Sequence, residues 1–153
     1  MRTMTGLLGS LPPGHSERLR ALGRHVAFPA GARIFEEGMT ADRFWIIHTG
    51  SVTLDQHIPG RRPQTVETVG HGELLGWSWM FRPYTWHMGA EAGSPVRALE
   101  FDAVDVRRLC EEDHELGYAL ALAVGEIISH RLQRSRMRLL EAFGPGGAGN
   151  RLL

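Results

Sequence analysis

The sequence predicts a mainly β fold, a double-stranded β-helix (jelly-roll-like) barrel with flanking helices and a long C-terminal helix. Two observations carry this prediction. Short apolar segments separated by glycines and prolines fill residues 25–101, and a helical pattern without prolines follows up to residue 143. With 153 residues, 42% of them hydrophobic, the chain is long enough to bury the core of one domain.

The first elements are a short helix and a series of short strands. Residues 16–22 have a helical composition and are followed by Gly23, a residue type that commonly ends helices. Val52 and Leu54 alternate with polar residues, which is typical of a strand with one buried face. The predicted strands are 25–28, 32–35, 44–48, 51–56, 64–69, 85–91 and 95–101.

The C-terminal part of the domain, residues 102–143, is predicted to hold two helices. Asp102 or Asp105 is placed to cap a short helix that runs through Cys110. A second helix then begins at Asp113 and extends for about 30 residues, or about 45 Å.

The long helix carries two apolar stripes and therefore needs two packing partners. Leu116, Leu120, Val124 and Ile127 form one stripe, and Ile128, Leu132 and Leu139 form the other. One stripe can pack on the barrel, and the other on the same helix of a second subunit. We therefore expect a homodimer through residues 113–143, with a helix lying flat on its own barrel as the alternative.

The charge balance and cysteine count exclude several classes of protein. The chain has 17 basic residues, all arginine, and 17 acidic residues, so its formal charge is zero. This balance argues against a nonspecific nucleic-acid coat or a membrane-surface protein. The single cysteine, Cys110, excludes an intrachain disulfide and a cysteine-rich zinc site. No apolar stretch has the length of a signal peptide or membrane span, so we expect a cytoplasmic protein.

Several catalytic motifs are matched only in part. The glycine-rich run 144–149 follows a helix at the chain end and does not join a strand to a helix, as a dinucleotide-binding turn must. His114 begins a zinc-protease pattern, but Tyr118 occupies the second ligand position. The run 76–80 lacks the second glycine of a nucleophile elbow. No His-x-His pair is present to bind a metal in the barrel. We predict neither an enzyme nor a metal site.

A more specific pattern runs through the predicted barrel. The segments 28–38, 41–47, 49–52 and 69–76 together resemble the cyclic nucleotide-binding domain family, the regulatory domain of catabolite activator-like proteins. The resemblance extends from Leu11 to Phe143. Gly31, Gly38 and Gly50 stand where tight turns need a positive φ or a close backbone approach. The side chains expected to point into the barrel are Phe28, Ile34, Phe44, Ile46 and Val52.

The resemblance implies a phosphate-binding cassette after the Gly-Glu-x-x-Gly run that ends at Gly76. In the family, a glutamate directly after the glycine holds the ribose hydroxyl, and an arginine followed by serine or threonine neutralises the phosphate. This chain has Trp77 at the glutamate position and Tyr84, followed by Thr85, at the arginine position. Arg82 lies two residues earlier and substitutes for that arginine only if the loop is shifted.

The candidate ligand-binding residues are therefore Glu73, Leu75, Gly76, Trp77, Ser78, Arg82, Tyr84 and Thr85. Because the glutamate and arginine are replaced, we expect no binding of cyclic AMP or cyclic GMP in the usual way. The tryptophans at 77, 79 and 86 allow two interpretations: a pocket for an apolar or aromatic ligand, or rings that fill the pocket as core. No cofactor is assigned, and a cyclic nucleotide or another small ligand remains the candidate.

The resemblance implies a bacterial regulator in signal transduction or transcription regulation. Only residues 144–153 follow the long helix, predicted as a flexible tail and too short for a helix-turn-helix domain. We therefore expect a stand-alone sensory or regulatory module in which pocket occupancy repositions the C-terminal helices for a protein partner, without direct DNA binding. Two alternatives remain: a cyclic nucleotide-binding signalling or transcription-regulator domain that uses Arg82, and a ligand-free dimerisation scaffold.

Overall fold

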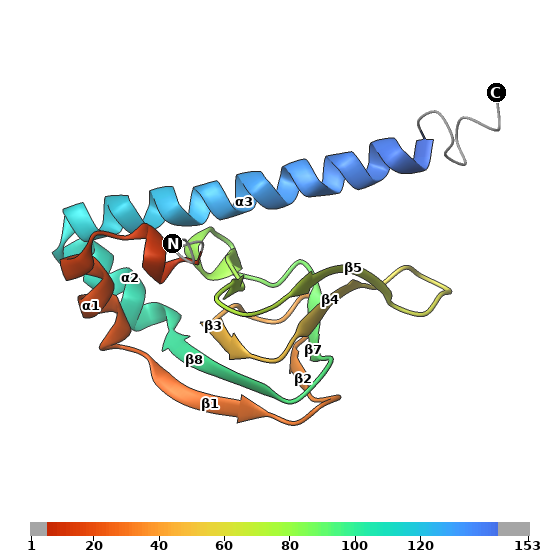
Figure 1. Ribbon diagram of the computed structural model, residues 1–153, viewed down its shortest axis with the longest axis horizontal. Helices are drawn as coiled ribbons and strands as arrows, with labels where there is room; N and C mark the ends of the chain where they lie inside the picture. The colour runs from red at the N-terminus through yellow and green to blue at the C-terminus, as the bar shows by residue number, and fades with distance from the viewer. Residues whose placement is uncertain (1–5, 144–153) are drawn as a thin grey trace.

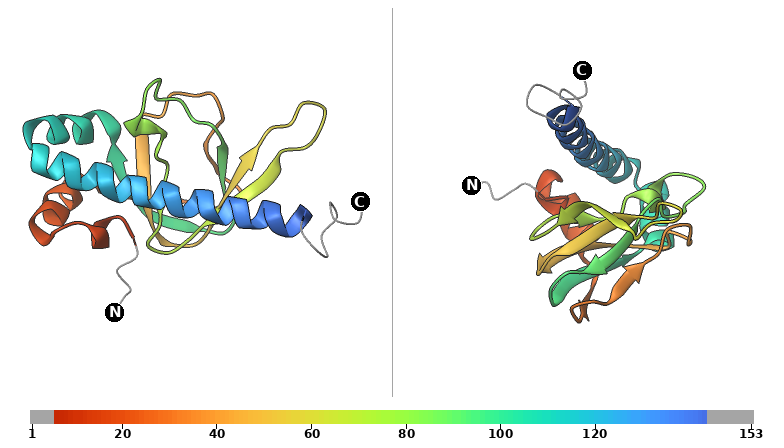
Figure 2. Two further views of the ribbon diagram at one scale, coloured as in Figure 1. Left: turned by 90° about the horizontal axis from the view of Figure 1, so that it is seen from above. Right: turned by 90° about the vertical axis from the view of Figure 1, so that its right-hand side faces the viewer.

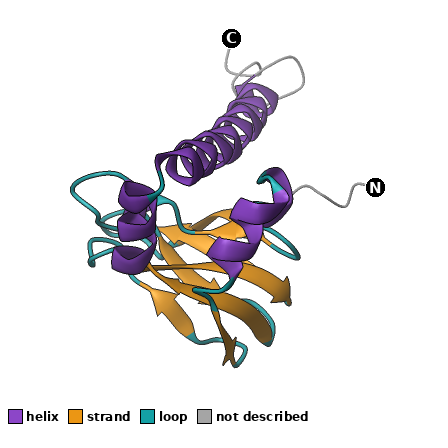
Figure 3. Ribbon diagram, turned by 90° about the vertical axis from the view of Figure 1, so that its left-hand side faces the viewer, coloured by secondary structure: helices purple, strands orange, loops and turns teal. Residues whose placement is uncertain are grey.

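The computed structural model describes residues 6–143, in which strands form a roll and helices gather on one side of it (Figures 1 and 3). The chain begins with the 3₁₀ turn η1 (Leu8–Ser10) and the helix α1 (Pro13–Arg20). The strands are β1 (Arg24–Phe28), β2 (Arg33–Phe35), β3 (Arg43–Thr49), β4 (Val52–Gln56), β5 (Gln64–Val69), β6 (Leu74–Leu75), β7 (Gly89–Ala92) and β8 (Val96–Asp102). A second 3₁₀ turn, η2 (Ser78–Met80), lies between β6 and β7, and the helices α2 (Ala103–Glu112) and α3 (His114–Phe143) complete the described chain.

The strands form two four-stranded antiparallel sheets. Their orders are β1-β8-β3-β6 and β2-β7-β4-β5. Strands distant in sequence are neighbours in both sheets, as in a jelly roll. The predicted fold class is therefore confirmed, although the two sheets remain separate and do not close into a barrel.

Most predicted strands match observed ones within one or two residues, but the strand predicted at 85–91 does not. Regular pairing begins only at Gly89, while Thr85 makes an isolated bridge with Thr40. Just before it, Tyr84 has a φ of 58°, a left-handed conformation that interrupts an extended chain. The two-residue strand β6 was not predicted, because Leu74 and Leu75 are too few to show a period.

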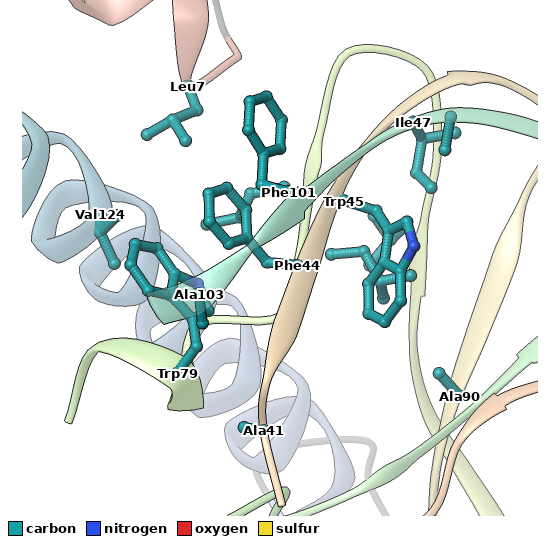
Figure 4. Close-up of a cluster of buried hydrophobic side chains, with 14 of the residues drawn as sticks. Leu7, Ala41, Phe44, Trp45, Ile47, Trp79, Ala90, Phe101, Ala103 and Val124 are labelled. Atoms are coloured by element: carbon teal, nitrogen blue, oxygen red, sulfur yellow. The ribbon is translucent and has the colours of Figure 1, made fainter. Parts of the chain in front are cut away.

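Strand β3 buries side chains on both of its faces, as Figure 4 shows. The Phe44 ring stacks with Trp79 and Phe101 at centroid distances of 4.1 and 4.7 Å, on the side of the helices. Trp45 points to the other side, into the roll, where it stacks on Phe35 at 5.8 Å. Because side chains alternate along a strand, Ile46 lies on the face of Phe44. The prediction that Phe44 and Ile46 point into the barrel was wrong.

Each of the two C-terminal helices begins at an aspartate. Asp102 accepts a hydrogen bond from the Asp105 N–H at 3.0 Å, which confirms the predicted cap of α2. Asp113 accepts one from the Leu116 N–H at 3.1 Å at the start of α3. That hydrogen bond, together with the nearby positive charge of Arg18, lowers the pKa of Asp113.

Helix α3 runs along the length of the molecule, above the strands (Figures 1 and 2). Its first stripe is buried at Leu116, Leu120 and Val124, as predicted. Of the second stripe, Ile128 is partly buried against the core, whereas Leu132 and Leu139 are exposed by 53% and 59%. No helix among residues 6–143 is long and apolar enough to cross a membrane. The predicted tail, 144–153, lies outside the described residues.

Candidate ligand-binding site

The candidate site begins at Gly76, where the chain turns from β6 into η2. Gly76 has a φ of 97°, a region that favours glycine. A Cβ atom at this position would lie 2.7 Å from the Trp86 ring, closer than any side chain tolerates. Both the backbone conformation and the neighbouring ring therefore require glycine, so this turn and Trp86 define one wall of the site.

A small cavity of about 30 Å³ lies beside this turn. This is room for about one or two water molecules, whereas pockets for small-molecule ligands measure roughly 300–1,000 Å³. Of the predicted site residues, Gly76, Trp77 and Ser78 line the cavity. Trp86, one of the three tryptophans considered for an apolar pocket, also lines it. The remaining lining residues were not predicted to bind ligand: Phe35, Leu54, His87, Met88 and Arg131.

Trp86 occupies the space beside the Gly76 turn. Its ring stacks on Phe35 with a centroid distance of 3.9 Å and an interplanar angle of 13°. The centroid of the Trp45 ring lies 6.3 Å from that of Trp86. Trp86 is only 5% exposed. Rings stacked at these distances belong to the hydrophobic core, because each ring covers a face of its neighbour that water would otherwise contact. Trp86 is therefore part of the core beside the Gly76 turn.

The other two tryptophans between residues 77 and 86 behave differently from Trp86. Trp79 is fully buried, but it packs against Phe44 on the helix side of β3 and so lies outside the cavity. Trp77 is half-buried and makes edge contacts with Phe81 and His87 at 6.1 and 5.8 Å. Trp77 thus stands at the edge of the cavity with an apolar ring.

The remaining predicted site residues lie outside the cavity lining. Arg82 is exposed, and Tyr84 packs under the Arg107 guanidinium, whose carbon lies 4.2 Å from the ring centre. Thr85 is held by its bridge to Thr40. The Glu73 carboxylate accepts the Gly70 N–H at 2.7 Å, and Leu75 is fully buried. The structure therefore brings together three of the eight predicted residues, Gly76–Ser78.

The charged group at the cavity comes from α3. Arg131 donates a hydrogen bond to the Leu74 carbonyl, and its Nε lies 3.4 Å from Glu67. Its side chain is only 11% exposed, and burial lowers its pKa. One sequence signal was available: the buried stripe reaches Ile127, and the next position on that face, 131, holds an arginine.

Two antiparallel sheets that form a roll, with a long helix across it and a small cavity at a glycine turn, make this a β-roll domain of the jelly-roll type. Residues 25–113, more than half of the chain, match the cyclic nucleotide-binding domain family. The chain belongs to that family, as the sequence resemblance indicated.

Known relatives extend this comparison. A CRP-like cAMP-activated global transcriptional regulator of Mycobacterium tuberculosis is 25% identical over 151 residues, covering 97% of this chain and 66% of the relative. A crystal structure of a cyclic nucleotide-binding protein from Geobacter metallireducens has a TM-score of 0.74 at 26% identity, covering 86% of this chain and 96% of that one. A cyclic nucleotide-binding domain from Methylobacillus flagellatus has a TM-score of 0.79 at 20% identity, covering 88% and 79%.

We expected a regulator of the cyclic nucleotide-binding domain family from the sequence, and these relatives agree with that family. The curated relative is a regulator, and the chain spans 66% of its length. The structure from Methylobacillus, at 20% identity, adds support for the fold alone.

Proposed function

We propose that this chain is a regulatory domain and not an enzyme, and that it does not accept cyclic AMP or cyclic GMP in the family's usual way. The observation that carries the proposal is the cavity of about 30 Å³ at the Gly76 turn, beside the stacked rings of Trp86 and Phe35. A nucleotide could enter only if Trp86 left this stack. Leaving would expose the Trp86 ring, which is 5% exposed in the closed form.

Electrostatics supports the same proposal. A cyclic phosphate taken out of water needs a cation with free hydrogen-bond donors beside it. Arg82 is exposed and outside the cavity lining. Arg131 does line the cavity, but its guanidinium already serves the Leu74 carbonyl and Glu67. A phosphate in this cavity would therefore have to compete with Glu67 for its counter-charge.

The name of the mycobacterial relative favours the alternative, a domain that binds cyclic AMP through Arg82. Thermal melting in cyclic AMP or cyclic GMP at about 1 mM separates the two functions, because a ligand that binds only the folded state raises the melting temperature. We expect no rise for the wild-type protein and none for Arg82→Gln. A rise in the wild type that Arg82→Gln abolishes would establish the alternative. A rise that Arg82→Gln keeps would also overturn the proposal.

We further propose that α3 pairs two copies of the chain. Directly opposite its buried stripe, residues recur with alternating spacings of four and three, as in a coiled coil. They are Tyr118, Leu122, Gly125, Ser129, Leu132, Arg136, Leu139 and Phe143, which we call the α3 seam. Its five large apolar members, Tyr118, Leu122, Leu132, Leu139 and Phe143, are each more than half exposed. Gly125 has no atom within 4 Å of a Cβ position, so a second helix can approach closely there.

Dimerisation would give the regulatory domain its output surface. In this proposal a partner protein reads the position of the paired α3 helices, and the domain makes no direct DNA contact of its own. A dimerisation scaffold that binds no ligand would need the same seam. The small cavity favours such a scaffold over a regulatory domain that depends on a cyclic nucleotide.

A further inference from the structure

The two halves of α3 are held to the roll by different forces. Leu116, Leu120, Ala123 and Val124 are buried, so the first half packs as part of the core. From Ser129 to Phe143 every residue is exposed except Arg131, which is partly buried. Apolar packing on the roll therefore ends near Ile128, although the helix continues beside the strands (Figure 2).

The second half is attached by arginines. Arg131, Arg134 and Arg138 fall on one face of the helix, at spacings of three and four. Arg134 donates to the Glu67 carboxylate at 2.8 Å, and the Arg131 Nε lies 3.4 Å from the same oxygen. Glu67 belongs to β5 and its side chain is 10% exposed.

Two backbone carbonyls complete this attachment. Arg138 donates to the Val66 carbonyl at 3.0 Å and lies 3.8 Å from the Glu67 carboxylate. Arg131 donates to the Leu74 carbonyl of β6. One carboxylate thus serves three guanidinium groups, and its loss would weaken all three contacts at once.

We propose that Glu67, Arg131, Arg134 and Arg138 form an arginine latch that holds residues 129–143 of α3 on β5, and that this half of the helix separates from the roll when the latch opens. The latch is electrostatic, whereas the first half of α3 is held by the core. The second half therefore detaches without unfolding the domain.

The latch also touches the candidate site. Arg131 lines the cavity beside Trp86 and, at the same time, pairs with Glu67. A displacement of this guanidinium changes the cavity wall and the latch together. The position of the second half of α3 is in this way connected to the cavity through a single side chain.

Hydrogen exchange of the full chain without ligand tests the latch, so its outcome does not depend on whether any nucleotide binds. Glu67→Gln removes the shared charge, and Glu141→Gln is the control, since it removes the same charge from the exposed part of the same helix. Arg134→Gln is a second latch variant. Because Arg134 is half-exposed, this variant should fold even if Glu67→Gln, at a mostly buried residue, does not.

We expect Glu67→Gln to speed amide exchange at residues 132–143 about tenfold, the size expected for losing charge-assisted hydrogen bonds. Exchange at 116–124 should stay unchanged, and Glu141→Gln should have no effect. Sodium chloride at about 1 M should act like Glu67→Gln, because it shortens the screening length to about 3 Å.

All variants are compared in a Leu132→Glu background, so that a second α3 helix on the seam cannot mask the change. Equal exchange at 132–143 in Glu67→Gln and Glu141→Gln would overturn the latch. So would faster exchange spread evenly over all of α3, in Glu67→Gln or in Arg134→Gln, because that result means loss of the fold and not of a local attachment.

Discussion

The contact between Gly76 and Trp86 determines how much space the site contains. Trp86 lies where a side chain at position 76 would stand, and its other face is stacked on Phe35. The cavity is small because the Trp86 ring, stacked on Phe35, fills the space beside the Gly76 turn. Trp86 is therefore expected to contribute to stability as a core residue does.

Trp86→Ala should lower the free energy of unfolding by about 3–5 kcal/mol, the usual cost of truncating a buried aromatic side chain. Urea denaturation monitored by far-ultraviolet circular dichroism gives this value. Trp77→Ala is the control, because Trp77 is only half-buried and its loss should cost less. Equal costs, or a larger cost for Trp77→Ala, would show that Trp86 is not the residue that fills the site.

Gly76→Ala tests the close approach of Trp86. Gly31 is a matched control: its φ is 87° against 97° for Gly76, but a Cβ at Gly31 would meet no atom within 4 Å. Both variants carry the backbone penalty, and only Gly76→Ala adds the clash. We expect Gly76→Ala to be less stable than Gly31→Ala by about 1–3 kcal/mol in urea denaturation. A difference near zero would mean that Trp86 moves aside freely.

The residues of the site could be predicted from the sequence only where they are neighbours along the chain. Gly76, Trp77 and Ser78 follow a recognisable glycine motif, and all three line the cavity. Arg131 and Phe35 reach it from α3 and β2, and their presence depends on how distant elements pack. The predicted stripe ended at Ile127, and although position 131 continues its spacing, periodicity does not show which part of the roll the stripe covers.

At the scale of elements, α3 depends on Asp113 at its start. The Leu116 N–H and the charge of Arg18 lower the pKa of Asp113 in the folded state, so the unfolded state takes up a proton more readily. The stabilisation is complete above the ordinary aspartate pKa of about 4 and is lost as pH falls below it.

Asp113→Asn should remove part of this acid sensitivity. We expect the wild-type melting temperature to fall more steeply below about pH 4 than that of the variant, and the variant to be less stable at pH 7. Thermal melts in a pH series measure both. Asp105→Asn, in the first turn of α2, provides a control carboxylate. Identical acid slopes for the wild type and Asp113→Asn would contradict the role of this cap.

Elements were predictable where local sequence determines them. Asp102 has a side chain that caps a helix, and α2 begins immediately after it. The segment predicted as a strand at 85–91 pairs regularly only from Gly89, and Thr85 pairs instead with Thr40 in an isolated bridge. That bridge joins two loops, and a single pair of residues produces no alternation of apolar and polar residues from which a strand could be predicted.

For the whole molecule, the proposed pairing of two α3 helices along the seam predicts a dimer. Leu132→Glu would place a charge in the middle of the seam, where burial against a second helix is costly. Sedimentation velocity should show a dimer for the wild-type protein and a monomer for this variant. His130→Glu adds a charge to an exposed position off the seam and should remain dimeric. A monomeric wild type, or a dimeric Leu132→Glu, would contradict the seam.

The arrangement of the layers was less predictable than the fold class. Strand periodicity and glycine positions indicated a jelly roll, and two four-stranded sheets confirm it. The sequence did not show that β3 has two buried faces, with Phe44 under the helices and Trp45 inside the roll. A strand covered on both sides has no apolar–polar alternation, so its inward face cannot be identified from the pattern alone.

Calorimetric titration of the wild-type protein with cyclic AMP measures whether the stacked Trp86 leaves room for a cyclic nucleotide at the Gly76 turn. We expect no saturable heat at ligand concentrations up to about 1 mM, which corresponds to a binding free energy weaker than about −4 kcal/mol. Saturable binding with one site per chain and a micromolar dissociation constant would contradict it.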